Sequence, residues 1–174
     1  LREPGATVLS EKIRKILLDN NNVINREEET LLFLAARASL VKEFIIPKLD
    51  NNTVVLCDRY IDSTVAYQAY GRGLDVSLIN KMNEFATCNT CPILTIIFDI
   101  SPNVVKERLK NKTLDRMEVA DDDFHHKVRH GYLDIAKSDE RYHVINCSNK
   151  SIVEIHAEVL RIVKLYIKGI KYEI

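Results

Sequence analysis

Three short apolar runs alternate with longer segments in which apolar residues recur every three or four positions. The runs cover residues 53–57, 93–100 and 143–147, and each is mostly apolar. Runs of this length, separated by helical segments, are typical of parallel strands that are covered on both faces. The pattern therefore predicts an α/β fold, with a parallel sheet flanked by helices.

Helical periodicity marks two segments that precede the first run. Helices are predicted from about 8 to 18 and from about 26 to 46. The second helix is apolar on nearly every side through residues 31–36, which is typical of a helix buried within a domain. Pro47 is expected to help close it, because proline cannot continue a helix.

Local start signals predict further helices. Asp75 can cap one helix, Ser101 before Pro102 can start another, and Ser151 with Glu154 has the form of a capping box. One more helix is predicted from residues spaced by four, with a glycine that allows a close approach: Phe124, Val128, Tyr132 and Gly131.

The composition is typical of one globular domain. With 174 residues, of which 46% are apolar, the chain can bury a core without disulfides or metals. Basic and acidic residues balance at 25 each, so no net charge attracts nucleic acid or an anionic membrane. The apolar runs are far shorter than the roughly 20 residues of a membrane helix. We expect a single domain over 1–174, with no nucleic-acid or membrane partner.

The chain contains four cysteines, whose positions indicate the cellular compartment in which the protein is expected. Cys57 and Cys147 lie in predicted strands, which is typical of small core residues and not of a disulfide framework. A cytoplasmic location is therefore predicted. Cys88 and Cys91 have the spacing of half a zinc site, but no second pair of ligands at suitable spacing accompanies them.

A polar block directly follows the first apolar run. Asp58 and Arg59 come where a strand is expected to end, and open α/β sheets bind ligands at the carboxyl ends of their strands. Such a pair can organise magnesium and a phosphate, or can form a structural salt bridge. Thr64, Tyr67 and Gln68 share one helix face, which is either a ligand wall or a solvated surface. The block favours an enzyme that handles phosphates.

Two other patterns each have a functional and a structural interpretation. Arg37 follows Phe33 by one helical turn, so the pair could stack on a flat base and hydrogen-bond one of its carbonyl oxygens. The alternative is a core phenylalanine beside an internal ion pair. The segment 106–116 holds five basic residues against two acidic ones. It could close over a phosphoanhydride as a lid, or it could be a solvated helix end.

Six blocks, taken in order, resemble those of bacterial thymidylate kinases. They are Arg2-Glu3-Pro4-Gly5, Phe33-Leu34-Ala35-Ala36-Arg37, Asp58-Arg59-Tyr60, Ser63-Thr64-Val65-Ala66-Tyr67-Gln68, Gly71-Arg72-Gly73 and Leu114-Asp115-Arg116-Met117-Glu118. The resemblance implies a three-layer P-loop kinase-like fold and a homodimer. It also implies transfer of the γ-phosphoryl group of ATP to dTMP with Mg²⁺, which gives dTDP for dTTP biosynthesis.

The resemblance implies a role for each residue of the thymidine site. Phe33 would stack on thymine, and Arg37 would hold the O4 side of the base. Thr64 and Gln68 would meet the remaining polar edge. Tyr67 would lie against the deoxyribose and discriminate against a 2′-hydroxyl.

Further roles that the resemblance implies concern the phosphates. Arg59, Arg2 and Arg14 would bind the acceptor phosphate. Asp58 and Glu3 would serve the magnesium and phosphate region, and Asp58 would hold the metal directly or through water. The implied catalytic residues are Asp58, Arg59, Arg116 and Glu3. The implied lid spans about 106–119 and carries Arg108, Lys110, Lys112 and Arg116. The residues implied to lie beside adenine are Asn146 and Ser148.

One family motif does not occur in the sequence. The family has a G-x-x-x-x-G-K-[ST] phosphate loop near its start, whereas none of the glycines here precedes Lys-Ser or Lys-Thr. We expect that Leu1 is an internal start, that a first strand, phosphate loop, helix and strand lie upstream, and that this chain alone is inactive. Two alternatives are an inactive module that keeps the dTMP site and another nucleoside or nucleoside monophosphate kinase.

Overall fold

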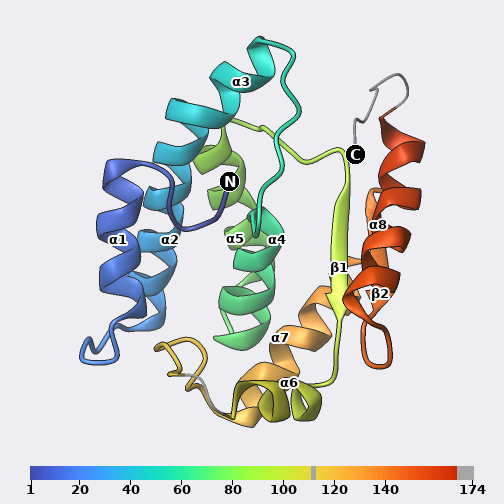
Figure 1. The fold of residues 1–174 in the computed structure, drawn as a ribbon. Helices are drawn as coiled ribbons and strands as arrows, with labels where there is room; N and C mark the ends of the chain where they lie inside the picture. The colour runs from blue at the N-terminus through green and yellow to red at the C-terminus, as the bar shows by residue number, and fades with distance from the viewer. Residues whose placement is uncertain (111–112, 168–174) are drawn as a thin grey trace. The chain divides into compact units, whose positions relative to one another are not determined.

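Residues 1–110 and 113–167 are described by the computed structural model (Figure 1). The chain divides into two units, which are described here one at a time. The first unit consists of Leu1–Cys91 and Lys112–Tyr132, and the second of Pro92–Asn111 and Leu133–Ile174.

The first unit is mainly helical. Its helices are α1 (Val8–Leu18), α2 (Arg26–Leu40), the π-helical segment η1 (Val41–Ile45), α3 (Ile46–Asp50), α4 (Ile61–Thr64), the π-helical segment η2 (Val65–Gly71) and α5 (Val76–Thr87). Helix α7 (Asp122–Ile135) begins in this unit and ends in the other. The helices predicted at 8–18, after Asp75 and around Phe124 are therefore confirmed.

Helix α2 does not end at Pro47, and that prediction was wrong. The helical path continues from Leu40 through η1 and α3 as far as Asp50. Within this path the backbone N–H of Ile46 donates to the carbonyl of Val41, five residues earlier. The π turn places Pro47 in the first turn of α3, where an N–H group is not needed. Proline is therefore accommodated without a break.

The strand predicted at 53–57 is not present as a strand, and that prediction was also wrong. Among the described residues this segment and Asp58 after it hydrogen-bond with residues 1–3, through Leu56 and Asp58. The terminal amine of Leu1 donates to the carbonyl of Leu56 at 2.7 Å, and one parallel bridge joins Arg2 to Asp58. A β-strand is defined by a series of bridges to a neighbouring strand, and a single bridge is not such a series.

Close contacts hold η2 against α7 in the first unit. A Cβ atom at Gly131 would lie 2.7 Å from Cγ of Tyr70, and one at Gly71 would lie 2.6 Å from Cε2 of Phe124. Phe124 and Val128 are buried. The expectation that Gly131 permits a close approach is confirmed, since no larger side chain fits there without a shift.

The second unit contains the sheet. Strands β1 (Thr95–Asp99) and β2 (Tyr142–Asn146) pair in parallel, from Thr95 opposite Tyr142 to Asp99 opposite Asn146. Helices α6 (Pro102–Leu109) and α8 (Ile152–Tyr166) follow the strands. Two of the predicted strands, their parallel pairing and the caps at Ser101 and Ser151 are therefore confirmed.

Helix α8 covers the strands through an apolar cluster. Ile145 and Cys147 are buried with Ile162 of α8, and Ile96 and Val159 pack against them. None of the described helices is long and apolar enough to cross a membrane.

Candidate active site

Arg37 lies at the centre of the polar core of the first unit, with 2% of its surface exposed. Its Nε and Nη2 donate to the Glu3 carboxylate, the shortest contact being 2.5 Å. Nη1 donates to Thr64 Oγ1 at 2.6 Å and to Asn83 Oδ1 at 2.7 Å, and Nη2 also donates to the Tyr60 carbonyl at 3.0 Å. Every nitrogen of this guanidinium therefore bonds to the protein.

This geometry matches the internal ion pair that the sequence left open for Arg37. Phe33 is partly buried and packs on the cluster of Ile13, Leu17 and Ala36. Burial raises the pKa of the Glu3 carboxyl, and the positive charge of Arg37 opposes that rise. The predicted contacts of Phe33 and Arg37 with a base stay predictions.

Three arginines that were assigned to the acceptor phosphate influence one another. Arg14 Nη1 donates to the carbonyl of Pro4 at 3.1 Å, and Arg2 pairs with Glu11 at 3.2 Å. Burial lowers the pKa of Arg14, and the positive charges of Arg2 and Arg59 lower it further. The fold thus gathers guanidinium groups that repel one another, and a bound anion would relieve that repulsion.

Arg59 and Tyr67 form the second part of this region. The guanidinium carbon of Arg59 lies 5.2 Å from the centre of the Tyr67 ring, and the ring meets Phe124 and Tyr132 edge-on at 5.9 and 6.3 Å. Burial opposes the charge on Arg59, but Tyr67, Tyr132 and the Asp58 carboxylate raise its pKa. Arg59 has a φ of +67°, a backbone conformation that non-glycine residues seldom adopt. Asp58 is exposed.

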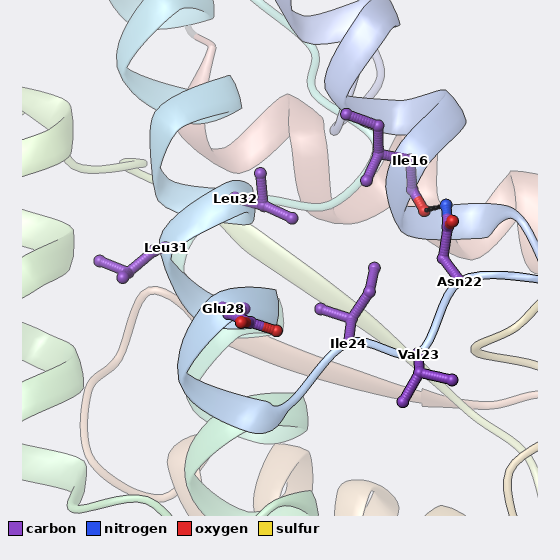
Figure 2. A pocket seen from close by; sticks show the side chains of 7 residues that line it. All are labelled: Ile16, Asn22, Val23, Ile24, Glu28, Leu31 and Leu32. Atoms are coloured by element: carbon purple, nitrogen blue, oxygen red, sulfur yellow. Dashed lines mark hydrogen bonds between the residues drawn. The ribbon is translucent and has the colours of Figure 1, made fainter.

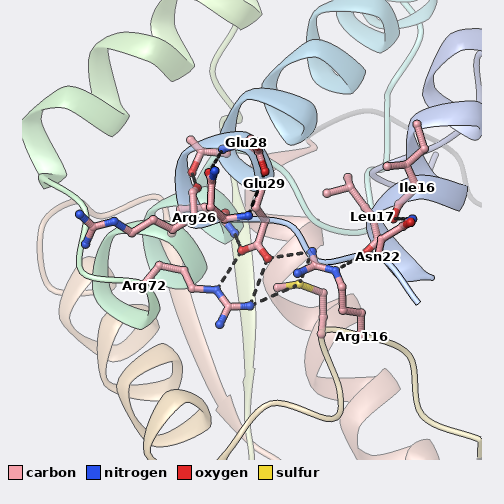
Figure 3. Close-up of polar contacts among 12 residues, drawn as sticks. Ile16, Leu17, Asn22, Arg26, Glu28, Glu29, Arg72 and Arg116 are labelled. Carbon is pink, nitrogen blue, oxygen red and sulfur yellow. Dashed lines mark hydrogen bonds and ion pairs between the residues drawn. The ribbon is translucent and has the colours of Figure 1, made fainter. Parts of the chain in front are cut away.

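Gln68 is held by the buried carboxylate of Glu29, which the sequence analysis did not single out; Figure 3 shows Glu29 with Arg72 and Arg116. Gln68 Nε2 donates to Oε1 of Glu29 at 3.0 Å, and both residues are 1% exposed. Glu29 also accepts from Arg72, at 3.0 and 3.1 Å, and pairs with Arg116 at 2.7 Å. Burial raises the pKa of Glu29, but hydrogen bonds from Arg72, Gln68 and Arg116 outweigh it and lower that pKa.

Arg116, predicted to belong to a lid, is largely buried and tied to α1 as well as to Glu29. Its Nε donates to the carbonyl of Leu17 at 2.7 Å, and 13% of its side chain is exposed. The amide of Asn20 donates to the carbonyl of Leu114 at 3.0 Å. These contacts hold the 114–116 segment against the end of α1.

Of the other predicted lid and adenine-side residues that the structure describes, Arg108, Lys110 and Asn146 are exposed and Ser148 is half-buried. Lys110 pairs with Glu107 at 2.7 Å. Lys112 lies outside the described residues. In the second unit, the backbone N–H of Ser148 donates to Oδ1 of Asn146 at 3.0 Å. Their predicted roles remain untested.

Two apolar hollows occur in the first unit, away from these polar groups. The first, of about 430 Å³, is lined by Ile16, Asn22, Val23, Ile24, Glu28, Leu31 and Leu32 (Figure 2). The second, of about 410 Å³, is lined by Leu31, Leu34, Ala35, Ala38, Lys81, Met82, Phe85 and Ala86. No residue predicted to bind a substrate lines either hollow.

Comparison with known proteins gives a consistent result. A family model described as "Thymidylate kinase" matches residues 1–159. The chain belongs to the thymidylate kinase family. The thymidylate kinase of Thermosipho africanus is 45% identical over 169 residues, which cover 97% of this chain and 84% of the relative. That of a Thermoanaerobacter species is 40% identical over 167 residues, covering 96% of this chain and 82% of the relative.

A solved structure agrees. The crystal structure of thymidylate kinase from Ehrlichia chaffeensis matches with a TM-score of 0.75 at 34% identity, over 94% of this chain and 78% of that one. The thymidylate kinase resemblance and the α/β fold with its parallel sheet flanked by helices are therefore confirmed. Membership of this family supports the assignment of the chain to the kinases of nucleotide biosynthesis.

Proposed function

We propose that the chain binds dTMP and takes part in the transfer of the γ-phosphoryl group of ATP to it, with Mg²⁺, giving dTDP. The observation that carries this proposal is the group of Arg2, Arg14 and Arg59, of which Arg59 lies against the ring of Tyr67. Such a cluster suits a dianionic phosphate, because guanidinium groups bind phosphate oxygens through paired N–H groups. The family motif that contains Arg59 supports the same assignment.

The base site in this proposal consists of residues around Arg37. Phe33 stacks on thymine, and Arg37 holds the O4 side. Thr64 and Gln68 meet the other polar edge, and Tyr67 packs on the deoxyribose and excludes a 2′-hydroxyl. For Arg37 to reach the base, at least one of its N–H groups must exchange a protein partner for the ligand.

The proposed magnesium site includes Asp58. The Asp58 carboxylate is exposed, and carboxylate oxygens are ligands that Mg²⁺ accepts. The Glu3 carboxylate, in contrast, is paired with Arg37. When bound, Mg²⁺ would offset the negative charge of the phosphates. We place Arg116 with Arg108, Lys110 and Lys112 in a lid over about 106–119, and Asn146 and Ser148 beside adenine. Both units would then belong to one kinase domain.

The binding site for the phosphates of ATP is the part of the proposed active site for which these residues provide the fewest groups. The 174-residue sequence contains no G-x-x-x-x-G-K-[ST] motif, so it offers no backbone cradle of that kind for the ATP phosphates. We propose that these residues by themselves bind dTMP without turning it over.

Titration calorimetry with dTMP, together with a coupled assay for ATP-dependent dTDP formation, tests this proposal. We expect the 174-residue chain to bind dTMP more tightly than dCMP and to show no turnover. Failure to bind dTMP would remove the acceptor-site assignment. Equal binding of dTMP, dUMP, dCMP and thymidine would favour another nucleoside or nucleoside monophosphate kinase.

The absence of a phosphate-loop motif from the sequence also favours a second candidate. This candidate is a binding module that keeps the dTMP site without kinase activity. The same two assays on the product of the complete gene separate the candidates. Turnover by that product supports the kinase, whereas dTMP binding without turnover supports the module.

We further propose a homodimer that packs through α2 and α5. Their shared face exposes large apolar side chains, with Phe85 89%, Leu31 58% and Leu78 52% exposed. The hollow of about 410 Å³ lies between the same helices. An exposed apolar face of this kind is typical of a protein interface.

Replacing Phe85 with aspartate is expected to convert the dimer to a monomer, because a buried unpaired carboxylate costs several kcal/mol at an apolar interface. Light scattering after size-exclusion chromatography measures the mass. Val153→Asp is the matched control, since Val153 is 77% exposed on α8, outside the proposed interface. A Phe85→Asp protein that stays dimeric would contradict the proposed interface.

A further inference from the structure

The Gln68 amide can face its surroundings in two ways, and Glu29 selects one of them. An ionised carboxylate only accepts hydrogen bonds, so the amide must turn its NH₂ group toward it. The observed bond, from Gln68 Nε2 to Glu29 Oε1 at 3.0 Å, has this arrangement. The carbonyl oxygen of Gln68 is therefore the amide atom turned away from Glu29.

Glu29 is itself held in place. Arg72 contacts both of its oxygens, and Arg116 contacts Oε2 at 2.7 Å (Figure 3). Arg72 is held in turn, because its guanidinium carbon lies 4.2 Å from the centre of the Phe124 ring. Hydrogen bonds from Arg72, Gln68 and Arg116 also lower the pKa of the Glu29 carboxyl and so keep it ionised. Rotation of the carboxylate away from Gln68 would break charge-assisted bonds at a buried site.

We propose that Glu29 is a positioning residue that fixes the Gln68 amide with its oxygen toward the nucleobase, and so selects bases that carry a hydrogen-bond donor at N3. This inference rests on the proposed function, because it takes Gln68 to face the base of dTMP. Thymine and uracil carry N3–H, whereas N3 of cytosine is an acceptor. A flipped amide would present NH₂, which suits cytosine and repels thymine.

The test is the ratio of dissociation constants for dCMP and dTMP, measured by calorimetry on the 174-residue chain and on Glu29→Gln. A glutamine at position 29 can accept or donate, so it no longer dictates the orientation of Gln68. We expect the ratio to fall about tenfold, the size of effect that one misplaced hydrogen bond produces. The ratio for dUMP and dTMP should not change, because uracil and thymine share the N3–H group.

Several variants separate positioning from simple loss of structure. Glu29→Asp keeps the charge for the two arginines but withdraws from Gln68, and is expected to lower the dCMP/dTMP ratio in the same direction. Glu27→Gln removes an exposed charge from the same turn of α2 and should leave the ratio unchanged. In a Gln68→Leu background, Glu29→Gln should leave the ratio unchanged as well.

The possible failures are distinguishable. If the unaltered chain prefers dTMP and both Glu29 variants keep the same dCMP/dTMP ratio, the positioning role is wrong while the proposed function stands. If the dUMP/dTMP ratio changes together with the dCMP/dTMP ratio, Glu29 acts on the whole site and not on the amide. If the unaltered chain binds no dTMP, the proposed function fails and this inference fails with it.

Discussion

Replacing Arg37 with methionine is expected to lower the free energy of unfolding by about 3–5 kcal/mol, the usual cost of leaving one partner of a buried ion pair alone. Arg37 is 2% exposed and Glu3 is 5% exposed, so water cannot take the place of the lost partner. Thr64 and Asn83 also lose a donor. Urea unfolding followed by circular dichroism measures the change.

This loss of stability should depend on pH. Burial already raises the pKa of Glu3, and removing Arg37 raises it further, since the cation was the opposing influence. A carboxyl group whose pKa is higher in the folded chain than in the unfolded chain stabilises the fold when the pH is below its pKa in the unfolded chain. That stabilisation is lost as the pH rises through its pKa in the folded chain. The deficit of Arg37→Met relative to the unaltered chain should therefore be smaller at pH 5 than at pH 8.

Two control variants sharpen this prediction. Arg26→Met breaks an exposed ion pair with Glu27 and should cost less than about 1 kcal/mol. In a Glu3→Gln background, the deficit that Arg37→Met causes should no longer depend on pH. A deficit below about 1 kcal/mol for Arg37→Met, or one of equal size at both pH values, would show that this pair does not stabilise the fold as described.

Replacing Arg59 with methionine is expected to weaken dTMP binding about 100-fold, while thymidine binding stays within about twofold. Charge-assisted hydrogen bonds to phosphate account for this size of effect, and thymidine has no phosphate to lose. Methionine retains an unbranched side chain beside the Tyr67 ring, so packing is disturbed little. Calorimetric titration of both ligands gives the two dissociation constants.

The comparison of the two ligands identifies the cause of any loss. Arg26→Met again serves as the control, because it removes one exposed arginine that has no predicted role in the site. Equal losses for dTMP and thymidine would mean that Arg59 supports the fold near Tyr67. An unchanged dTMP affinity would remove Arg59 from the phosphate site.

Sequence reasoning succeeded where the signal is local. The caps at Asp75, Ser101 and Ser151 depend on contacts within three residues, and each is present. The runs at 93–100 and 143–147 became β1 and β2 because each finds the other as a partner. The six family blocks, which are local in the same sense, were sufficient to indicate the family.

The sequence was less informative wherever a residue depends on a distant partner. Segment 53–57 has strand-forming composition, but in the described residues the one bridge beside it joins Arg2 to Asp58, the residue that follows the segment. Pro47 is a helix breaker by type, and the preceding π turn accommodates it. Glu29 lies 39 residues from Gln68 in sequence, so no spacing rule predicts their bond.

The left-handed backbone of Arg59 places two requirements on one position. A side chain at a φ of +67° costs roughly 1–2 kcal/mol, and glycine would avoid that cost. Glycine, however, has no cation to offer a phosphate. Selection for thermal stability and selection for ligand affinity therefore favour different residues at this position. A screen for heat-resistant variants would be expected to recover glycine or asparagine there, with a more stable chain and a weaker nucleotide site.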